Sequence, residues 1–523
     1  MTSQPFAASS IGLDNMKLPS DLEQISGLTV QQTKAGFPTL VVSFEGPNDP
    51  MNAQNWSASK KLRNFLAYSY PCFVTSFSSG ALSPATGQIA KDFHVSPEVA
   101  LLSTTTLFLL GYTGGPFVWG PSSDYYGRKI PMMISVFGAL CFGAGASSAK
   151  DYQTLSLCRF FQGAFGSCGI VIPMAAFADM LNPEFCGYAA IVFVFIVLSG
   201  PLIASPISGF TVDNDSLNWR WCSWWTVFAN ALALVCMSSV VESYTPYLLQ
   251  QKALKLRHTT GEFSIHAPLD ENKRSLKQVL KMLATLPFIM GAKEPILALI
   301  SIYLAFVYAL VYVFLISYDL VFIDGYHMSS GVGGLTLLSL VLGCGLGVAA
   351  SILDQRRMFH KMASNGGLMI PEWRMPLCSA GAVAFALGLF FFGWTGAYPD
   401  HIHWIVPVTS GLVTGFGLLV ISYCMFSFII DVYKINSGPA LAMNAIVRSS
   451  LGAGFPLFAR QMFENLGIQY ASTLLGCLAA VMIPVPFAFW RWGPRIRARS
   501  TFAMASPPSD AIKAENRGMR ADN

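Results

Sequence analysis

The sequence predicts an all-α polytopic membrane protein with twelve transmembrane helices in two six-helix bundles. Composition is the first reason, since 53% of the 523 residues are hydrophobic and only 12% are charged, whereas globular domains carry about 25% charged residues. Twelve apolar runs are the second reason. Each approaches the length of about 20 residues that a helix needs to cross a hydrocarbon core of about 30 Å. A polar segment at 242–295 separates six runs from six.

The apolar runs give the expected positions of the spans. The first six are expected at 65–89, 99–119, 130–149, 152–175, 187–210 and 222–241, and the last six at 296–320, 331–351, 376–394, 402–430, 437–460 and 469–490. The chain then divides into a cytosolic N-terminal tail at 1–60, an N-terminal bundle at 61–241, a cytosolic central loop at 242–295, a C-terminal bundle at 296–492 and a cytosolic C-terminal tail at 493–523. The tail at 1–60 has no periodic pattern and no apolar segment resembling a signal peptide.

The distribution of basic residues predicts the orientation in the membrane. Of 33 Lys and Arg residues, four lie in loops on one side of the alternating topology and two lie within spans, which leaves 27 for the other side. Cytosolic loops are enriched in Lys and Arg, so both termini and the central loop are expected in the cytosol. Nothing in the charge balance suggests a nucleic acid partner.

A short polar turn separates the second and third spans. It contains Gly120, Asp124, Gly127, Arg128 and Lys129 in the order Gly-x3-Asp-x2-Gly-Arg-Lys. The glycines permit a tight turn, while the acid and the bases can lock a helix end electrostatically. Ordinary enrichment of basic residues in cytosolic loops would not require the acid or the second glycine.

Two arginines lie inside predicted spans. Arg159 is followed by Gln162 in the fourth span, and Arg448 lies in the middle of the eleventh. An arginine at bilayer depth costs about 2.5–3.5 kcal/mol on insertion scales, so each is expected to face a cavity or a partner. The alternative is that each arginine bonds backbone carbonyls and holds helices together.

The fifth span contains Gly200, Pro201 and Gly209 within a stretch of small residues. Small residues let helices approach closely, and prolines leave unpaired carbonyls that soften a helix. These three residues are therefore candidates for a hinge or a packing site, with plain helix packing as the alternative to a role in gating.

Several further blocks are distinctive. They are Asp49-Pro50-x-Asn52-x2-Asn55-Trp56-Ser57, Glu242-Ser243-Tyr244-Thr245-Pro246, Glu294-Pro295-Ile296, Pro371-Glu372-Trp373-Arg374 and Arg448-Ser449-Ser450. Together with the polar turn, they resemble the fungal twelve-span drug:proton antiporter (DHA1-type) family of the major facilitator superfamily, over about residues 49–500. The resemblance implies the major facilitator fold, with a substrate site between two related bundles. A trace of this repeat is Gly347 followed by Asp354-Gln355-Arg356-Arg357 after the eighth span.

The resemblance also implies roles for single residues. Asp124, Gly127, Arg128 and Lys129 would form a cytosolic gate, in which Arg128 pairs with an acid at the end of the fourth span, and Asp179 is placed to be that acid. A pair that exists in only one conformation biases a two-state equilibrium. Arg159 and Gln162 would serve proton coupling or substrate binding, and Arg448 would line the cavity. In the fifth span, the family motif Gly-Pro-x2-Gly-Pro-x2-Gly-Gly is matched at Gly200, Pro201 and Gly209, while Ala204, Ser205 and Ser208 depart from it.

The acidic residues limit the kind of substrate. None of the 28 Asp and Glu residues lies near the middle of a predicted span; the nearest are Asp179, Asp431, Asp319 and Asp324. A site for a polyamine would be expected to bury carboxylates, so the sequence favours an uncharged or anionic substrate. Candidates for the proton site are Asp179, Asp124 and Asp319. Candidates for an aromatic cavity wall are Phe73, Phe77, Tyr303, Tyr308 and Tyr312.

The sequence therefore predicts a secondary active transporter that exports a small organic molecule, such as a secondary metabolite, an organic acid or a drug. Proton antiport and alternating access are implied by the resemblance, and the plasma membrane is expected, with a vacuolar or other internal membrane as the alternative. No cofactor, metal site or enzymatic motif is expected, no nucleotide loop is present, and the protein is expected to be a monomer. A facilitator or importer on the same fold remains open, and so does a transporter-like receptor, which the short tail after Arg499 disfavours.

Overall fold

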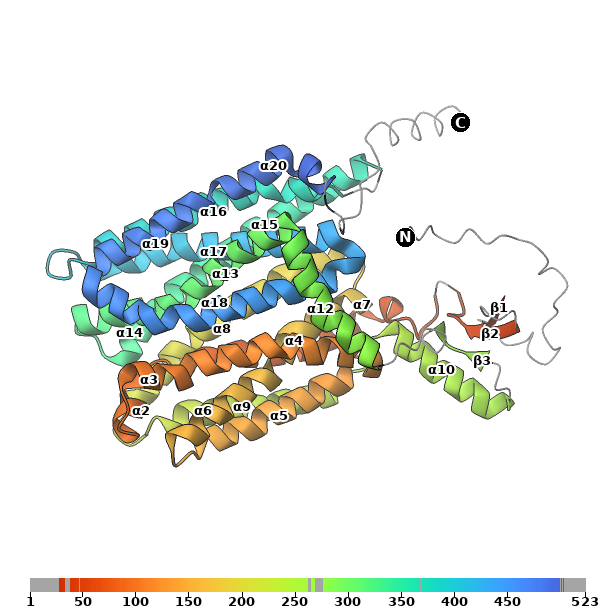
Figure 1. The fold of residues 1–523 in the computed structure, drawn as a ribbon, viewed down its shortest axis with the longest axis horizontal. Helices are drawn as coiled ribbons and strands as arrows, with labels where there is room; N and C mark the ends of the chain where they lie inside the picture. Colours follow the sequence, from red (N-terminus) through yellow and green to blue (C-terminus); the bar gives the residue numbers. More distant parts are fainter. Residues whose placement is uncertain are drawn as a thin grey trace.

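The computed structural model describes residues 28–32, 38–46, 48–261, 265–268, 276–366, 369–498, 500 and 502. Long helices run along one common axis, and a small sheet with one further helix extends beyond one end of them (Figure 1). This end carries the polar turn at Gly127 and is called the predicted cytosolic end. The opposite end, with α2, α3 and α14, is called the predicted outer end.

The first half of the chain forms one set of packed helices. Its elements are η1 (Ala53–Asn55), α1 (Ala58–Gly80), α2 (Thr86–Asp92), α3 (Pro97–Leu101), the π-helical turn η2 (Leu102–Thr106), α4 (Leu107–Tyr126), α5 (Lys129–Ser147), α6 (Tyr152–Gly166), α7 (Cys168–Met180), α8 (Pro183–Val212) and α9 (Arg220–Ser238). Helix α1 packs on α8, α4 on α6, and α5 on α9. The first span thus pairs with the fifth, the second with the fourth, and the third with the sixth.

The second half repeats this arrangement. Its elements are α13 (Pro295–Tyr318), the π-helical turn η3 (Asp319–Gly325), α14 (Ser330–Thr336), α15 (Leu338–Ser364), η4 (Pro371–Arg374), α16 (Met375–Gly396), α17 (Ile405–Tyr433), η5 (Lys434–Asn436), α18 (Ser437–Leu466), α19 (Ile468–Met482) and α20 (Pro484–Arg497). Helix α13 packs on α18, α15 on α17, and α16 on α19. The same pairing order in both halves is the structural form of an internal repeat, and Figure 1 shows the second half above the first.

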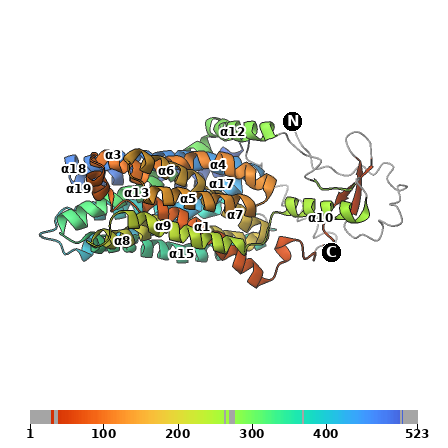
Figure 2. The same cartoon turned by 90° about the horizontal axis from the view of Figure 1, so that it is seen from below.

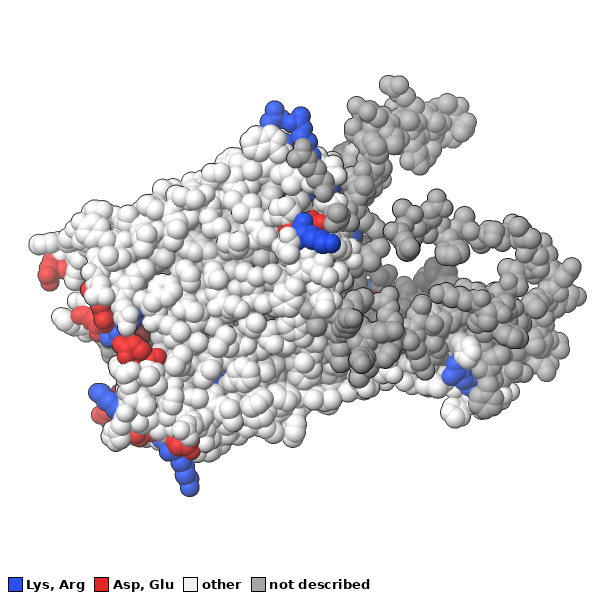
Figure 3. All heavy atoms as spheres, viewed as in Figure 1, with Lys and Arg blue, Asp and Glu red and all other residues white. Residues whose placement is uncertain are grey.

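The two halves meet along α8 and α4. Helix α8 packs on α14 and α15, and α4 packs on α18. Helix α12 (Leu276–Lys293), from the segment between the halves, crosses this seam and packs on both α4 and α18 (Figure 1). On the face that Figure 3 shows, the described surface along the long axis carries few charged residues, whereas acids and bases gather at the predicted outer end. Such a band is what a surface in contact with lipid requires.

Most of the predicted spans are helices apolar enough to cross a membrane. Within the described residues, nine helices meet this criterion, and a tenth does if α2 and the α3–α4 segment, bent by 118°, form one span. The remaining two spans correspond to α1 and α18, which are helical but more polar. Helix α1 also begins and ends earlier than the expected 65–89, because Lys60 and Lys61 hide its first turn from a hydropathy criterion and Pro84 follows its end.

A small cytosolic-end module joins two distant parts of the chain. Strands β1 (Leu28–Gln32) and β2 (Pro38–Val42) pair antiparallel, and β3 (Ile265–His266) adds to β2 in parallel. Helix α10 (Thr245–Thr260) packs beside them, and Figure 2 shows α10 and the sheet beyond the end of the helical bundle. The sequence showed no pattern at 1–60, because the strands are short and β2 completes the sheet by pairing with β3, more than two hundred positions away.

Lys252 of α10 ties this module to the segment before α1. Its ammonium donates to Glu45 over 2.8 Å and lies 3.9 Å from Asp49, whose side chain is 3% exposed. The carboxylate of Asp49 also accepts from the N–H groups of Glu45 and Met51. The distinctive block at Asp49 is therefore a buried turn that joins the N-terminal segment to α10.

Candidate functional site

Arg128 organises the polar turn at the predicted cytosolic end. Its side chain is 8% exposed, and it donates from Nε to Asp179 over 2.9 Å and from Nη1 to Asp124 over 2.8 Å. Burial alone would lower the pKa of Arg128, but the two carboxylates raise that pKa above its ordinary value, so the guanidinium stays charged. The structure thus brings together three of the four charged residues that the sequence analysis proposed for a gate, Asp124, Arg128 and Asp179. Asp124 and Arg128 bracket the end of α4, and Asp179 lies at the end of α7.

Glu242 completes this turn from the segment after α9. Its carboxylate accepts from the N–H groups of Arg128 and Lys129, each over 3.0 Å. A carboxylate in this position satisfies free N–H groups at the start of α5 and favours the helix dipole. Gly127 has a φ of +81°, and a Cβ there would lie 2.5 Å from Glu242 Oε2. Glycine is therefore required both for the backbone conformation and for space.

The ammonium of Lys129 pairs with neither Asp124 nor Asp179 in the described structure. It donates to the carbonyls of Ser238 and Val240, over 3.1 and 2.7 Å, at the end of α9. Asn64 of α1 binds the segment that follows α9, because its amide exchanges two hydrogen bonds with the backbone of Val241. The third, sixth and first spans are thereby joined at this end.

The second half has a matching cluster around Arg374, whose side chain is 5% exposed. Arg374 donates from Nε to Asp431 over 2.8 Å and from Nη1 to Gln355 Oε1 over 3.0 Å and to Tyr423 Oη over 2.7 Å. The hydroxyl of Tyr423 in turn donates to Gln355 Oε1 over 2.7 Å. Next to this cluster, Arg497 holds Glu372 with two hydrogen bonds.

The two clusters correspond position by position. Arg374 precedes α16 as Arg128 precedes α5, and an aspartate near the end of α17 corresponds to the one near the end of α7. Gln355 stands where the first half has Asp124. The sequence suggested Asp354-Gln355-Arg356-Arg357 as the trace of the repeat, but only Gln355 of that run contacts the buried arginine.

Helix α8 makes close contacts with both halves. A Cβ at Gly200 would lie 2.5 Å from the side chain of Ser76 in α1, and a Cβ at Gly80 would lie 2.8 Å from Cα of Pro201. A Cβ at Gly209 would lie 2.5 Å from the carbonyl of Ser330 in α14. Gly200 and Pro201 therefore pack against the same half, and Gly209 packs against the other.

Contacts between the halves occur at both ends of the molecule. At the predicted outer end, the carboxylate of Asp213 accepts from the N–H groups of Ser330 and Gly331 over 3.0 and 2.7 Å. At the predicted cytosolic end, the rings of Tyr188 and Phe359 lie 6.2 Å apart. The seam between the halves is therefore bridged on both sides of the membrane centre.

Arg159 is buried inside the first half. It donates to the carbonyls of Ser103, Ser78 and Thr104 over 3.3, 3.1 and 2.7 Å, and to Gln162 Oε1 over 2.9 Å. The guanidinium also lies 4.4 Å from the ring centre of Phe108. All these acceptors belong to the protein, and Arg159 does not line the central cavity.

Gln162 continues this network toward the sixth span. Its amide nitrogen donates to Thr226 Oγ1 of α9 over 3.2 Å, and a Cβ at Gly143 would lie 2.8 Å from that nitrogen. The pair Arg159–Gln162 thus connects α1, η2, α6 and α9.

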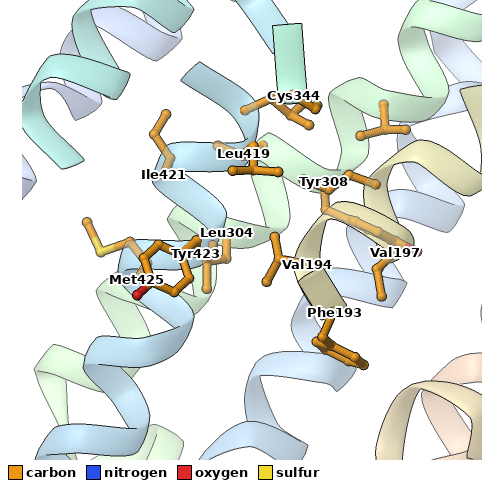
Figure 4. Packing of buried hydrophobic residues seen from close by; sticks show 14 of the residues in the cluster. Phe193, Val194, Val197, Leu304, Tyr308, Cys344, Leu419, Ile421, Tyr423 and Met425 are labelled. Atoms are coloured by element: carbon orange, nitrogen blue, oxygen red, sulfur yellow. The ribbon is translucent and has the colours of Figure 1, made fainter. Parts of the chain in front are cut away.

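A small cavity lies at the seam between α8 and the second half. Its volume is about 20 Å³, room for about one water molecule. Its walls are Phe193, Val194, Val197 and Leu198 of α8, Leu304 and Tyr308 of α13, Ser422 and Phe426 of α17, and Arg448 of α18. Figure 4 shows Phe193, Val194 and Val197 of α8 beside Leu304 and Tyr308 of α13. No Asp or Glu occurs among the described residues of the wall.

Arg448 and one of the five aromatic candidates line this cavity, and the other four aromatic candidates do not. Arg448 lines it, 4.7 Å from the ring centre of Tyr308. Of the five aromatic residues that the sequence proposed for the wall, only Tyr308 is part of it. Tyr312 lies behind, where its hydroxyl is 3.0 Å from that of Tyr308, while Phe77 packs with Ala81 and Ala204 elsewhere.

The candidate proton sites also differ in their surroundings. Asp179 and Asp124 are both paired with Arg128. Asp319 begins the π-helical turn η3 at the predicted outer end and is half-buried. In the described part of the chain, no hydrogen bond or salt bridge joins its carboxylate to another residue.

Several residues of these networks were not singled out as site residues from the sequence. Glu242 and Arg374 appeared only inside blocks quoted for the resemblance, and Gln355, Tyr423 and Asn64 were not assigned any role. A signal existed for Arg374, because an arginine directly before a span and an aspartate at the end of the next span recur in both halves. The hydrogen bonds of Glu242 to backbone N–H groups leave no such signal.

The comparisons with known proteins agree with this architecture. The family model described as Major Facilitator Superfamily matches residues 72–456. The chain is 39% identical over 464 residues to the major facilitator superfamily multidrug transporter FLU1 of Candida albicans, covering 88% of this chain and 76% of that protein. It is 36% identical over 465 residues to the ascochitine biosynthesis cluster MFS transporter of Didymella fabae, covering 88% and 89%. Among solved structures, the proton:xylose symporter XylE matches with a TM-score of 0.58 at 15% identity, covering 84% and 96%.

Proposed function

Because this chain belongs to the major facilitator superfamily, we propose that it exports a small organic molecule by proton antiport and alternating access. The observation that carries the proposal is the cavity at Arg448, enclosed by α8 from one half and by α13, α17 and α18 from the other. A site whose walls belong to two bundles opens to one side or the other when the bundles rock. We place both termini in the cytosol and the protein in the plasma membrane as a monomer.

The Arg128 cluster is proposed to be the cytosolic gate. Arg128 holds the end of α4 through Asp124 and the end of α7 through Asp179, so these helix ends cannot separate while the pairs exist. Opening toward the cytosol would break them, and the gate would thereby bias the protein toward the closed cytosolic side. The Arg374 cluster is proposed to do the same for the second half.

We assign the proton to Asp319. This acid has no hydrogen bond or salt bridge to another described residue, whereas both carboxylates beside Arg128 are held by a charged partner. A partly buried carboxylate without a salt bridge binds and releases a proton at a lower free-energy cost than a carboxylate that is paired with an arginine. One pH unit then supplies about 1.4 kcal/mol for accumulation of substrate.

The substrate is proposed to be uncharged or anionic, and a secondary metabolite or a drug in type. The wall residues include one cation and no acid, which disfavours a polyamine. The proteins most similar in sequence include a transporter named for multidrug transport and one named for a biosynthesis cluster, and this kind of substrate fits an apolar, aromatic wall.

Uptake into inside-out vesicles tests the proposal. We expect a neutral apolar drug and an organic acid to accumulate when the lumen is acidic, and Asp319→Asn to remove the dependence on the gradient. The exposed neighbour Asp324→Asn is the matched control and should leave that dependence intact. Uptake that is equal with and without the gradient in the wild type would instead indicate a facilitator.

A further inference from the structure

In the part of the chain that the structure describes, no residue accepts a hydrogen bond from the guanidinium of Arg448. Its Nε is buried without a partner, and the guanidinium lies over the ring of Tyr308, 4.7 Å from the ring centre. A guanidinium carries five N–H donors, and a buried donor without an acceptor is unfavourable. The structure therefore leaves a set of oriented donors for something other than the protein.

The other polar groups of the cavity wall have no hydrogen to offer. The hydroxyl of Ser422 donates to the carbonyl of Leu418 over 2.7 Å. The donor state of the wall residue Tyr308 depends on two residues outside the wall, Ser79 and Tyr312. The hydroxyl of Ser79 donates to the carbonyl of Ser76 over 2.6 Å and lies 3.0 Å from the hydroxyl of Tyr312. Since Ser79 has only one hydroxyl hydrogen, Tyr312 must donate to Ser79.

The same reasoning determines the direction of the hydrogen bond made by the hydroxyl of Tyr308. It lies 3.0 Å from that of Tyr312, whose hydrogen is already used, so Tyr308 must donate to Tyr312. Arg448 is then the one side chain among the described wall residues with free donors. It is also the one charged group there.

Arg448 is surrounded by aromatic faces. Tyr308 stacks on the guanidinium, and the rings of Phe193 and Phe426, from opposite halves, lie 5.9 Å apart with an angle of 35°. Aromatic rings attract one another in offset or edge-to-face arrangements with centroids about 4.5–7 Å apart, so these faces suit an aromatic ligand. The arrangement combines one planar cation with apolar, aromatic walls.

We propose that this cavity is a binding site for an aromatic monocarboxylate, whose carboxylate pairs with the guanidinium of Arg448 while its ring lies against Phe193, Phe426 and Tyr308. The fork of an arginine matches a carboxylate with two parallel hydrogen bonds, and one cation balances one negative charge. This inference rests on the proposed function, because the closed cavity must widen when α8 moves away from α13 and α17.

Binding of a matched series to the purified full-length protein in lipid nanodiscs tests the proposal. The probes are 2-naphthoate, 2-naphthamide and 2-naphthylmethylammonium, which share one ring system and differ in charge. We expect the wild type to bind the acid at least about tenfold more tightly than the amide, and the ammonium least. Arg448→Gln should weaken binding of the acid to the level of the amide and leave the amide unchanged, and Arg448→Lys should restore part of the difference.

Arg491→Gln is the control, since Arg491 is an exposed arginine of α20 far along the chain from the cavity. It should bind all three probes as the wild type does, and melting temperatures should show that every variant is folded. Equal affinity for acid and amide in the wild type, absence of binding of the acid, or an equal loss of both in Arg448→Gln would overturn the inference.

A parallel uptake assay with a neutral drug separates this inference from the proposed function. If the drug is transported while the Arg448 variant leaves the ratio of acid to amide unchanged, the transporter proposal stands and the carboxylate site is wrong. If the carboxylate binds through Arg448 but nothing is transported, the carboxylate site stands and the transporter proposal is wrong.

Discussion

Arg159 and Arg448 each lie within a predicted span, one in each half of the protein, and their surroundings differ sharply. Arg159 donates to three backbone carbonyls and to Gln162, whereas no described residue accepts a hydrogen bond from Arg448. The first arginine is satisfied by the fold, whereas the second has no acceptor among the described residues. The difference teaches that the role of an arginine within a membrane span must be inferred from the hydrogen-bond acceptors around it.

This comparison also separates two roles that the resemblance left together. Both arginines were candidates for substrate binding or coupling. We now propose that Arg159 fixes the relative positions of α1, η2, α6 and α9, on which coupling depends, and that Arg448 contacts the substrate. Each of the following substitutions tests whether the hydrogen-bond partners of a charged side chain determine how much it contributes to stability.

The largest effect is expected for Arg159→Leu. The carbonyls of Ser103, Ser78 and Thr104 would lose their partner, and a buried acceptor left unsatisfied costs about 1–3 kcal/mol. We expect the free energy of unfolding to fall by about 3 kcal/mol or more, with a matching loss of folded protein in the membrane. Thermal melting monitored by size-exclusion chromatography measures this, and an unchanged melting temperature would contradict it.

The two arginines at the predicted cytosolic end extend the comparison to groups paired with acids. Arg128→Gln and Arg374→Gln each leave a mostly buried aspartate unpaired, so each should cost about 2 kcal/mol, below the 3–5 kcal/mol of a fully buried pair. Only Arg128→Gln should expose Cys186, whose thiol lies 3.6 Å from the carbonyl of Leu181, just after α7. Maleimide labelling followed by mass spectrometry measures this. Equal labelling of Cys186 in both variants would show that the clusters do not act on separate halves.

Asp49 offers a smaller test outside the membrane. Burial would raise the pKa of its carboxyl, but the N–H groups of Glu45 and Met51 and the ammonium of Lys252 hold that pKa below its ordinary value. Because the folded pKa is lower than the unfolded one, its contribution is present above about pH 4 and is lost as the pH falls through the folded pKa.

Hydrogen-exchange protection factors of the amides at 45 and 51 measure this contribution. We expect them to be equal at pH 7 and pH 5 and to decrease below about pH 4. Asp49→Asn should lower the local stability by about 1 kcal/mol at pH 7. Protection that decreases between pH 7 and pH 5 would mean that another group controls the turn.

The smallest effect on stability is expected for Arg448→Leu. No described acceptor loses a partner, and a guanidinium whose Nε is buried without an acceptor is removed, so the free energy of unfolding should stay within about 0.5 kcal/mol of the wild type or rise. Chemical denaturation checks this, with Arg159→Leu as the matched variant. A loss as large as that of Arg159→Leu would show that Arg448 holds the fold together.

The fold was largely predictable, because long apolar runs and the placement of basic residues follow from the membrane itself. The pair of Arg128 with Asp179 was also predictable, because the family resemblance implied an acid for Arg128 at the end of the fourth span and Asp179 lies there. The contact of Glu242 with backbone N–H groups was not, because any acid near a turn could make it. Helix facing could not be predicted either, which is why only Tyr308 of five aromatic candidates lines the cavity.

The sheet at the predicted cytosolic end shows another limit of prediction from the sequence. Strand β2 pairs with β3 across the whole first half of the chain, and a two-residue strand leaves no periodic pattern to detect. The role of the arginines was open for a similar reason. Spacing placed both within spans, but only their neighbours in space distinguish Arg159 from Arg448.

One measurement tests the central claim, that Arg159 is held by the fold and Arg448 is held by the ligand. Melting temperatures of the wild type, Arg159→Leu and Arg448→Leu would be recorded with and without 2-naphthoate. We expect Arg159→Leu to melt far below the wild type, and Arg448→Leu to melt like the wild type but to lose the stabilisation by the acid. A low melting temperature for Arg448→Leu, together with an unchanged stabilisation by 2-naphthoate, would contradict the claim.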